Sequence, residues 1–340
     1  MGAGEQGLIY AGDERLSTKK HLLALLETSR GRSISGEHIA KQLKVSRNAV
    51  WKAIQELKKE GYRIQAVTNK GYCLCEDNDI LSVQGMLPFL VSKSSADRVI
   101  IHTLLASTNQ SAKELAVAGA EHGTVIIADG QTAGRGRYGR QFHSPPGKGI
   151  YMSFILHPAH LKLKTPTLIT AFAAVAVCEA IEAVTKKAPR IKWVNDIYVD
   201  EKKICGILTE AVTDLESGGI QWVVVGIGIN FSTPDIDFPE AIRQVAGSIF
   251  PNGQPTTTRN HLIAEVINRV LERGDRFNED EILDRYRERL LMLGKKVFVV
   301  GAQETYEATA IDIDQDGRLI VKKESGEVQS LYAGEISIRY

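Results

Sequence analysis

Residues 129–149 read DGQTAGRGRYGRQFHSPPGKG, in which arginines alternate with glycines. The segment holds three arginines and Lys148 against one acidic residue, Asp129. This alternation predicts a functional loop, because glycine lets the backbone approach a ligand closely and a guanidinium binds carboxylate or phosphate oxygens in pairs. A disordered basic surface loop is the alternative. We name this segment, Asp129–Gly149, the arginine–glycine loop and expect it to bind an anionic ligand.

Two common phosphate-binding motifs do not fit this loop. The glycine spacing from Gly134 to Gly139 matches G-x-G-x-x-G, but two prolines and further glycines follow where the dinucleotide-binding motif needs a helix. A Walker loop needs Ser or Thr after its Gly-Lys pair, and neither Gly147-Lys148 nor Gly294-Lys295 meets that condition. The loop therefore belongs to another class of anion site.

Two shorter polar clusters lie in the same part of the chain. Ser107–Asn109 falls between a predicted strand and a predicted helix, and taken alone such a cluster is typical of a helix cap. Lys192–Asp196 places a lysine between predicted strands, and taken alone such a lysine is typical of a side chain that extends to solvent. Each cluster gains a functional interpretation only in combination with the arginine–glycine loop.

Strand and helix patterns mix over the central part of the chain. After Gly294 the pattern turns to short strands separated by glycine and aspartate turns, as in a small β-barrel. The chain thus divides near residue 80 and again near residue 293. The predicted helices are Asn109–Ala118, Pro166–Val184, Thr258–Phe277 and Asp280–Leu290, and the predicted central strands are Val99–Leu105, Thr124–Ala128, Ile150–His157, Ile191–Trp193, Ile197–Val199, Ile204–Val212 and Gln221–Ile229.

The first quarter of the chain is basic. Residues 1–75 contain 13 lysines and arginines and 7 acidic residues. Because the whole chain contains 42 and 41, residues 76–340 carry 29 basic and 34 acidic residues. This asymmetry is typical of a nucleic-acid-binding module joined to a second function, although a solvated positive face would give the same count.

Three helices and a hairpin are predicted in this basic part. Apolar spacing predicts helices at Thr18–Glu27, at Gly36–Leu43 and from Ser46 to Lys59, followed by strands at Tyr62–Thr68 and Gly71–Cys75. That order is the order of a winged helix-turn-helix, and a small protein-binding helical domain is the alternative. The candidate DNA-contacting residues, on the polar face of the third helix and in the hairpin turn, are Arg47, Asn48, Trp51, Lys52, Gln55 and Lys70.

Composition excludes several classes of protein. With 340 residues, 43% hydrophobic and 24% charged, the chain is an ordinary globular protein, so disorder and low-complexity repeats are excluded. The N-terminus lacks a signal-peptide pattern, and the apolar run Leu168–Ile181 is shorter than a membrane span. Four cysteines without zinc-site spacing indicate reduced thiols. We therefore expect a cytoplasmic protein with no membrane partner.

In combination, the arginine–glycine loop, Lys192–Asp196 and the Gly-Ile-Gly-Ile-Asn run Gly226–Asn230 resemble the biotin–protein ligase family. The resemblance extends from Thr18 to Tyr340 and is to the bifunctional form, the biotin operon repressor, in which a winged helix precedes the ligase. It implies an α+β multidomain fold. The expected parts are a flexible tail at 1–17, a winged helix-turn-helix at 18–78, a catalytic domain at 79–292 with a mixed sheet like that of class II aminoacyl-tRNA synthetases, and an SH3-like β-barrel at 293–340.

The resemblance also implies roles for individual residues. Lys192 and Arg137 are the implied catalytic residues, and Lys192 bridges the biotin carboxylate and the α-phosphate. Phe142 stands where some family members carry Trp to stack on adenine. The implied biotin-binding residues are Ser107, Thr108, Asn109, Gln131, Arg135, Gly136, Arg137 and Lys192, and the implied nucleotide-binding residues are Arg137, Arg140, Phe142 and Asn230.

The implied reaction joins biotin to ATP, which brings Mg²⁺ with it, so that no protein-bound metal site is expected. The product biotinyl-5′-AMP then biotinylates a lysine of the biotin carboxyl carrier domain of acetyl-CoA carboxylase or a similar enzyme. The adenylate-bound chain is expected to dimerise on biotin operator DNA, with an exposed strand edge at Gln221–Ile229 as the candidate contact.

Two alternatives stay open. The chain can be a ligase whose winged helix no longer regulates, or a ligand-sensing regulator without catalysis. Lys192 and the arginine–glycine loop argue against the second, because a sensor needs affinity but no charge for a transition state.

Overall fold

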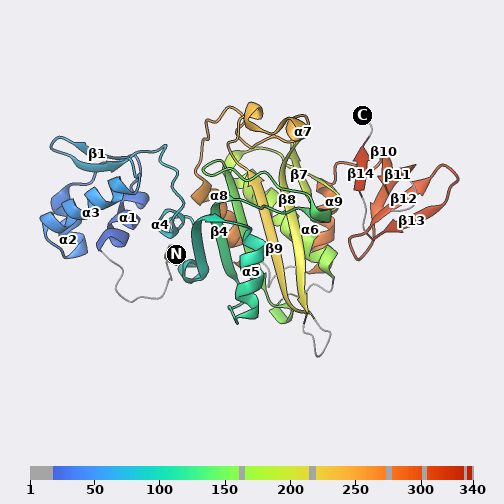
Figure 1. Cartoon of the computed structure of the whole chain (residues 1–340), viewed down its shortest axis with the longest axis horizontal. Coiled ribbons are helices and arrows are strands. Elements are labelled where there is room, and N and C mark those ends of the chain that lie inside the picture. The colour runs from blue at the N-terminus through green and yellow to red at the C-terminus, as the bar shows by residue number, and fades with distance from the viewer. Residues whose placement is uncertain are drawn as a thin grey trace, which may run out of the picture.

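The computed structural model describes residues 18–160, 165–213, 220–272, 278–300, 305–332 and 335–338. A helical N-terminal part, a central mixed sheet and a small C-terminal β domain follow one another along the longest axis of the molecule (Figure 1). The tail expected at residues 1–17 lies outside the described residues.

The N-terminal part is a winged helix-turn-helix, as predicted. Ser35 and Ser46 cap the second and third helices by accepting hydrogen bonds from backbone amides. Leucine and isoleucine side chains on the inner faces of the helices form a separate core. The elements are α1 (Thr18–Thr28), α2 (Gly36–Leu43), α3 (Arg47–Lys59), β1 (Ile64–Val67) and β2 (Gly71–Leu74), with β1 and β2 antiparallel.

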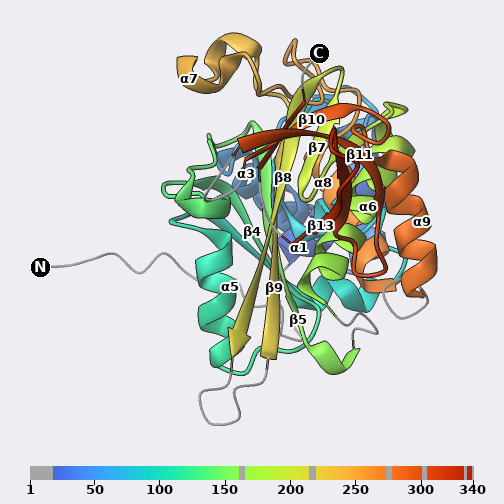
Figure 2. The same ribbon diagram turned by 90° about the vertical axis from the view of Figure 1, so that its right-hand side faces the viewer.

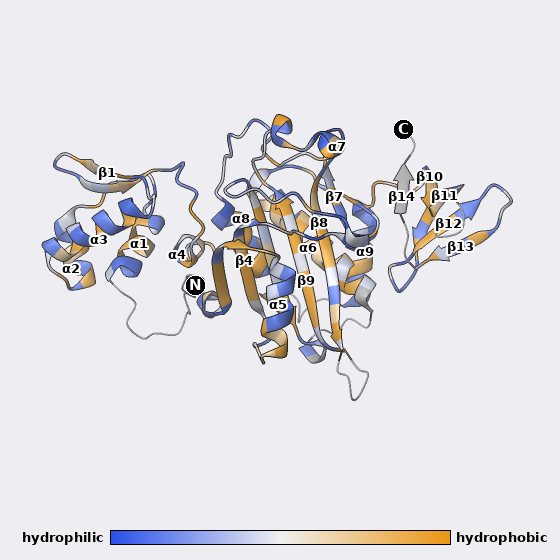
Figure 3. Cartoon of the chain, in the orientation of Figure 1, coloured by the Kyte–Doolittle hydropathy of each residue, from blue (hydrophilic) through white to orange (hydrophobic). Residues whose placement is uncertain are grey.

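A seven-stranded sheet forms the central domain, in the order β3-β4-β5-β9-β8-β7-β6. The pair β3–β4 is parallel and the other pairs are antiparallel. Strands of the sheet centre are strongly apolar (Figure 3). The strands are β3 (Val99–Leu105), β4 (Thr124–Gln131), β5 (Gly149–Leu156), β6 (Arg190–Lys192), β7 (Asp196–Val199), β8 (Lys202–Thr213) and β9 (Ile220–Asn230).

The expectation of an exposed edge at Gln221–Ile229 is wrong. Strand β9 lies between β5 and β8 and pairs with both. The edge strands of the described sheet are β3 and β6. A near-continuous apolar run is typical of a strand that is buried on both faces, so the apolar character of this strand did not indicate an exposed edge.

Helices cover both faces of the sheet (Figure 2). Along β9 the odd-numbered side chains, such as Val225 and Ile227, join the main core with α6 and α8, whereas Val224 belongs to a second cluster with α5. The helices are α4 (Val83–Met86), α5 (Thr108–Val117), α6 (Pro166–Thr185), α7 (Glu240–Arg243), α8 (Arg259–Ile267) and α9 (Glu279–Arg289). The even-numbered face of β9 is therefore free to build a site beside α5.

Helix α6 agrees with the predicted helix Pro166–Val184 to within one residue. Its segment Thr167–Thr185 is apolar and long enough to cross a membrane by length and composition, but 78% of its most apolar window is buried inside the molecule. It packs against β8, α8 and α9. These contacts make it the core helix of the central domain.

The helix predicted from Thr258 to Phe277 differs in detail. The α-helical part ends at Ile267, and a π-helical turn, Asn268–Glu272, follows. The predicted end at Phe277 lies outside the described residues. At this change of helix type the side chain of Asn268 donates to the carbonyl of Phe89 and accepts a hydrogen bond from the amide of Val91.

The C-terminal strands form one antiparallel sheet in the order β13-β12-β11-β10-β14. This domain contacts the central domain at the Lys192–Asp196 cluster, where the indole Nε1 of Trp193 donates to the carbonyl of Gly317 at 3.0 Å. Arg287 on α9 also pairs with Asp312 at 2.7 Å. The strands are β10 (Lys296–Val300), β11 (Thr305–Ile313), β12 (Leu319–Lys323), β13 (Val328–Leu331) and β14 (Glu335–Ile338).

Candidate active site

One cavity of about 460 Å³ lies on the α5 side of the sheet. It is bounded by the start of α5, the end of β4, the strands β6 to β9, the arginine–glycine loop and the segment around α7. The structure brings together in its wall every residue that the sequence analysis assigned to biotin, nucleotide or catalysis, namely Ser107, Thr108, Asn109, Gln131, Arg135, Gly136, Arg137, Arg140, Phe142, Lys192 and Asn230.

The arginine–glycine loop has a defined local structure. The amide of Gly136 donates to the carbonyl of Arg140 at 2.7 Å, and the amide of Phe142 donates to the carbonyl of Gly134 at 2.9 Å. A short 3-10 turn, Arg137–Gly139, lies between these bonds. The loop therefore folds back on itself, and its side chains enter the cavity from a closed turn rather than from an extended strap.

Buried hydroxyls and amides form one end of the cavity. The hydroxyl of Ser153 lies within hydrogen-bond distance of Thr108 Oγ1, at 2.8 Å, and of Asn109 Oδ1, at 2.7 Å. The amide and the hydroxyl of Thr108 both donate to Gln131 Oε1, at 2.8 and 3.2 Å. Gln131 Nε2 in turn donates to Ser144 Oγ at 3.0 Å. We call these five residues the polar network.

The polar network continues through Asn109 to an ion pair. Asn109 Nδ2 donates to the carbonyl of Leu208 at 3.2 Å and to Glu210 Oε2 at 2.8 Å, while Lys113 pairs with Glu210 at 2.8 Å. Burial alone would raise the pKa of Glu210, but the hydrogen bonds from Lys113 and Asn109 outweigh it and hold that pKa below its ordinary value. Because both amide hydrogens of Asn109 have protein acceptors, this side chain ties α5 to β8.

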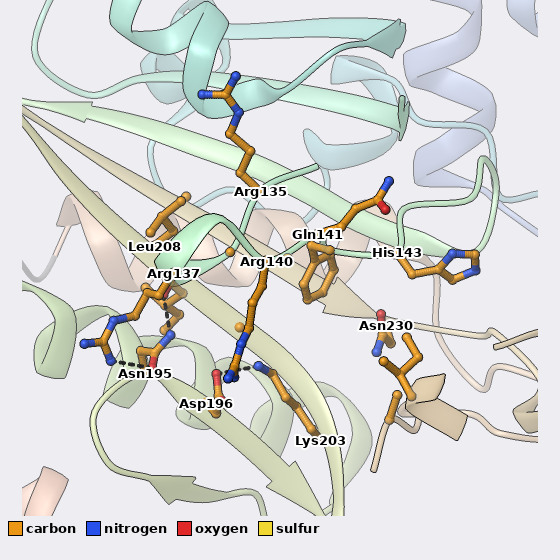
Figure 4. Close-up of a pocket in the computed structure, with 18 of the residues that line it drawn as sticks. Arg135, Arg137, Arg140, Gln141, His143, Asn195, Asp196, Lys203, Leu208 and Asn230 are labelled. Carbon is orange, nitrogen blue, oxygen red and sulfur yellow. Dashed lines mark hydrogen bonds and ion pairs between the residues drawn. The ribbon is translucent and has the colours of Figure 1, made fainter. Parts of the chain in front are cut away.

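Cationic side chains dominate the other end. The described residues that line the cavity include five lysines and arginines, namely Arg135, Arg137, Arg140, Lys192 and Lys203, and one carboxylate, Asp196. Arg137 Nη1 donates to Asn195 Oδ1 at 3.2 Å, and Lys203 pairs with Asp196 at 2.7 Å. Figure 4 shows Arg137 and Arg140 directed toward Asn195 and Asp196, whereas Arg135 points the other way. We call this region the cationic end.

Lys192 is positioned by its neighbours in the chain. It is the last residue of β6, it is half-buried, and its ammonium lies 5.9 Å from the ring centre of Tyr198. The next residue, Trp193, is anchored on Gly317 as described above, and the carbonyl of Val194 accepts a hydrogen bond from Tyr286 at 2.8 Å. Burial raises the pKa of Tyr286 far above its ordinary value, so this phenol stays a donor.

Glycines on β8 and β9 form the floor of the cavity. A methyl group at Gly228 would lie 2.7 Å from the ring of Phe142, and one at Gly206, its cross-strand partner, would lie 3.5 Å from the same ring. A methyl group at Gly226 would overlap Asn109 Oδ1. The alternating glycines of Gly-Ile-Gly-Ile-Asn thus make room for Asn109 and Phe142 on one face, while the isoleucines fill the core on the other.

The sequence analysis missed several residues of the site. Ser153 is fully buried, and its signal was a single polar residue within the apolar run Gly149–Leu156. Glu210 reaches the site only through strand pairing and had no signal that distinguished it from a surface residue. Asn195 lies within the Lys192–Asp196 cluster, but the sequence analysis gave it no role of its own. Asn230, which was predicted, donates to the carbonyl of Gly247 at 3.0 Å and so also supports the segment after α7.

The candidate DNA-contacting residues lie elsewhere. Arg47, Asn48, Trp51 and Lys52 are exposed on α3, and Gln55 is half-buried beside them. Lys70 is exposed in the turn between β1 and β2. The described structure therefore places the predicted site residues in two separate regions, one on the winged helix and one in the cavity.

These features define a class of protein in which a winged helix-turn-helix is joined to a ligase-type catalytic domain. The sequence model of the Biotin/lipoate A/B protein ligase family matches residues 102–230, that of an HTH domain matches 18–73, and that of the biotin protein ligase C-terminal domain matches 292–339. The bifunctional ligase/repressor BirA of Bacillus subtilis is 35% identical over 331 residues, which cover 95% of this chain and 99% of that protein. The chain belongs to the family of bifunctional biotin–protein ligases and repressors.

More distant relatives agree with this assignment. The bifunctional ligase/repressor BirA of Escherichia coli is 29% identical over 329 residues, which cover 94% of this chain and 96% of that protein. Among solved structures, the biotin protein ligase from Aquifex aeolicus in complex with biotin and ATP has a TM-score of 0.61 and 29% identity, and covers 71% of this chain and 98% of its own.

Proposed function

We propose that the cavity joins biotin to ATP to form biotinyl-5′-AMP and pyrophosphate, and that the chain then transfers biotin to a lysine of a biotin carboxyl carrier domain. The observation that carries this proposal is the arrangement of the cavity, in which a neutral polar network adjoins a cationic end. Biotin has the matching polarity, with a neutral ureido ring at one end and a carboxylate at the other.

The polar network is suited to the ureido group. Thr108 and Asn109 of this network, and Ser107 beside them, are each about 95% buried, so hydrogen bonds to a ligand there are made in a low-dielectric, preorganised setting. Gln131, at the end of β4, links this region to the arginine–glycine loop. The biotin rings would thus be held by groups whose positions are set before the ligand enters.

The cationic end is suited to the first chemical step. The biotin carboxylate attacks the α-phosphate of ATP, and pyrophosphate leaves. Two anions meet in this step, so cations must offset their repulsion and stabilise the charge on the pentavalent phosphorus. In our proposal Lys192 bridges the biotin carboxylate and the α-phosphate, and Arg137, held by Asn195, binds the phosphate oxygens. Mg²⁺ enters with ATP as part of the substrate and offsets phosphate charge.

The nucleotide is assigned to the region around Phe142. Its ring lies over Gly228 and Gly206, and Ile242 and Ala246 line the same cavity. In this proposal adenine stacks on Phe142, with Arg140 and Asn230 at its border. The arginine–glycine loop covers the mixed anhydride and keeps water from hydrolysing it.

The second step and the regulation use the same intermediate. The amine of the acceptor lysine attacks the biotinyl carbonyl, and AMP leaves. Without acceptor, the adenylate-bound chain pairs with a second copy, and two winged helices contact a two-fold biotin operator through Arg47, Asn48, Trp51, Lys52, Gln55 and Lys70. In this proposal both the ligase reaction and the DNA binding take place in the cytoplasm.

Biotin-dependent exchange of pyrophosphate into ATP tests the first step. We expect exchange by the unaltered chain and a loss of about 100- to 1,000-fold in Lys192→Ala, because one donor to a developing charge has an effect of that size. Biotin binding should persist in the variant. The matched control is Lys295→Ala, which removes an exposed lysine outside the cavity lining.

Two results would contradict the proposal. Absence of exchange in the unaltered chain would contradict the ligase assignment, and unaltered exchange in Lys192→Ala would contradict the role of that lysine. A gel-shift assay on the promoters of biotin genes from the same genome, with and without biotin plus ATP, separates the repressor from a ligase whose winged helix does not regulate.

A further inference from the structure

A single buried arginine joins three segments that are far apart in the sequence. Arg259 is the first residue of α8 and is 3% exposed. Its guanidinium donates to Asp79 Oδ2 at 2.8 Å, to Asp129 Oδ1 at 2.6 Å, to the carbonyl of Asp79 at 2.8 Å and to the carbonyl of Gly149 at 3.2 Å. Its backbone amide donates to Asp79 Oδ1 at 2.9 Å. It does not line the cavity.

Two of these partners are the ends of the arginine–glycine loop. Asp129 precedes Gln131 of the polar network on β4, and Gly149 is the first residue of β5. One guanidinium therefore holds both strands from which the loop emerges. A shift of either strand end at the base of the loop changes the position that Arg259 must take.

The third partner belongs to the linker, residues 75–82, between β2 of the winged helix and α4. Asn260, next to Arg259, fixes the same linker by accepting from the amide of Ser82 at 3.1 Å and by donating to the carbonyl of Ile80 at 2.7 Å. The linker thus lies along the start of α8 and is held there by two consecutive side chains.

The linker is equally well fixed to the winged helix. Arg30, which follows α1, donates to the carbonyls of Cys75, Glu76 and Asn78, at 3.3, 3.2 and 2.6 Å. Ile80 packs against the core of the winged helix. A continuous series of contacts therefore runs from the winged helix through the linker to Arg259 and the base of the arginine–glycine loop.

Electrostatics keeps the two carboxylates in this series together. Burial raises the pKa of Asp79, and the positive charge of Arg259 opposes that rise. A guanidinium stays charged at all relevant pH values, so a carboxylate that separates from Arg259 loses both its counter-charge and its charge-assisted hydrogen bonds. If Asp129 moves, Arg259 and Asp79 are therefore expected to move with it, because breaking either ion pair would cost more.

We propose that Arg259 is a positioning residue that couples the arginine–glycine loop to the linker, so that ligand binding in the cavity alters the linker and changes in the linker alter ligand affinity. This inference rests on the proposed function of the cavity. It assigns the coupling to one residue and its two carboxylates. Because coupling between sites is reciprocal, both directions are measurable.

The test uses the full chain with Asp79→Asn, which keeps the shape of a side chain outside the cavity and removes its charge. The matched control is Asp77→Asn, in the same linker, where an exposed aspartate pairs with Arg63 and does not contact Arg259. Amide hydrogen exchange of residues 75–82 is followed before and after addition of biotin plus ATP, and the Kd for biotinyl-5′-AMP is measured in parallel.

We expect biotin plus ATP to change linker exchange in the unaltered chain and in Asp77→Asn, and to leave it unchanged in Asp79→Asn. The Kd for biotinyl-5′-AMP should rise about 5- to 150-fold in Asp79→Asn only, the range of typical coupling between sites. In a double-mutant cycle, Asp79→Asn and Asp129→Asn should not be additive, because both act through Arg259.

Three outcomes would overturn the coupling. The first is that biotin plus ATP does not change amide exchange of the linker in the unaltered chain. The others are that Asp79→Asn keeps the linker response and the affinity for the adenylate, or that the effects of Asp79→Asn and Asp129→Asn are additive. A merely structural role would lower the unfolding temperature of Asp79→Asn and leave its response to ligand intact, which also overturns it. Failure of the unaltered chain to form the adenylate at all would instead contradict the proposed function.

Discussion

The polar network and the cationic end occupy one cavity, yet their side chains are held in different ways. In the polar network the side chains of Thr108, Asn109 and Gln131 already bond to one another or to Ser153 and Ser144. At the cationic end four positive side chains, Arg137, Arg140, Lys192 and Lys203, meet one carboxylate, Asp196, among the described lining residues. The first region resembles a finished binding surface, whereas the second carries an excess of charge that an anionic ligand would balance.

This difference separates two requirements of the proposed reaction. A neutral ring is recognised by groups that need not move, and their rigidity limits the entropy lost on binding. Phosphates and a carboxylate attract cationic side chains by their charge, so these side chains need not be fixed in position before the ligand binds. The contrast predicts that substitutions in the two regions affect different ligands and different measured quantities.

The largest effect is expected from two neighbouring glycines that serve opposite regions. Gly226→Ala would displace Asn109, and Gly228→Ala would displace Phe142. Overpacking costs about 1–3 kcal/mol, and the upper end applies here because the floor is sheet backbone. We expect Gly226→Ala to raise the Kd for biotin, and Gly228→Ala to raise the KM for ATP in pyrophosphate exchange, each by up to about 100-fold.

Each of these variants is the control for the other, since both add one methyl group to the same face of β9. Loss of affinity for the same ligand in both variants would contradict the division of the cavity into two regions.

A smaller effect is expected at the centre of the polar network. Ser153→Ala removes the donor to Thr108 Oγ1 and Asn109 Oδ1 at a position with no solvent exposure. Leaving buried polar atoms unpaired should lower the free energy of unfolding by about 1–2 kcal/mol in urea titrations and weaken biotin binding. The exposed Ser94→Ala serves as control, and equal losses in both variants would mean that the buried network adds nothing to stability.

The smallest effect concerns pH. The pKa of Glu210 is held below its ordinary value in the folded state, so the unfolded chain binds more protons as pH falls. Its contribution to stability is therefore complete above about pH 4.3, the unperturbed value for Glu, and is lost as pH falls through the folded-state pKa. We expect Glu210→Gln to flatten the acid side of the stability profile.

The stability of Glu210→Gln at acid pH could instead equal that of the unaltered chain. In that case the contacts of Glu210 with Asn109 and Lys113 would contribute nothing to stability. The matched control is Glu114→Gln, which alters an exposed acid on α5 that accepts a hydrogen bond from Gln110.

Local patterns were enough to predict most elements. Ser35 and Ser46 cap helices of the winged helix-turn-helix, and the apolar spacing of Leu22, Ile39 and Ile54 marks its core. The same holds for the arginine–glycine loop, whose residues carry their chemistry in the sequence itself. Such features depend on residues within a few positions of one another in the chain, so they can be predicted from the sequence alone.

Strand order could not be predicted in the same way. The run Gln221–Ile229 was expected at an edge and lies inside the sheet as part of β9. Apolar character reports burial of a strand, but it does not report which strands lie on either side.

The sequence by itself determined the winged helix and the mixed α+β character of the centre, and it predicted an anion-binding role for the arginine–glycine loop. Only the tertiary structure decided that Ser153 joins the polar network and that Glu210 accepts from its Asn109. It also decided that Gly226 and Gly228 make room for Asn109 and Phe142, and that Arg259 joins Asp79 to Asp129. The physical reason is the range of the interactions. Caps, periodicity and charge act between neighbours in the chain, whereas a buried hydrogen bond or ion pair depends on residues that only the folded sheet brings within 3 Å of one another.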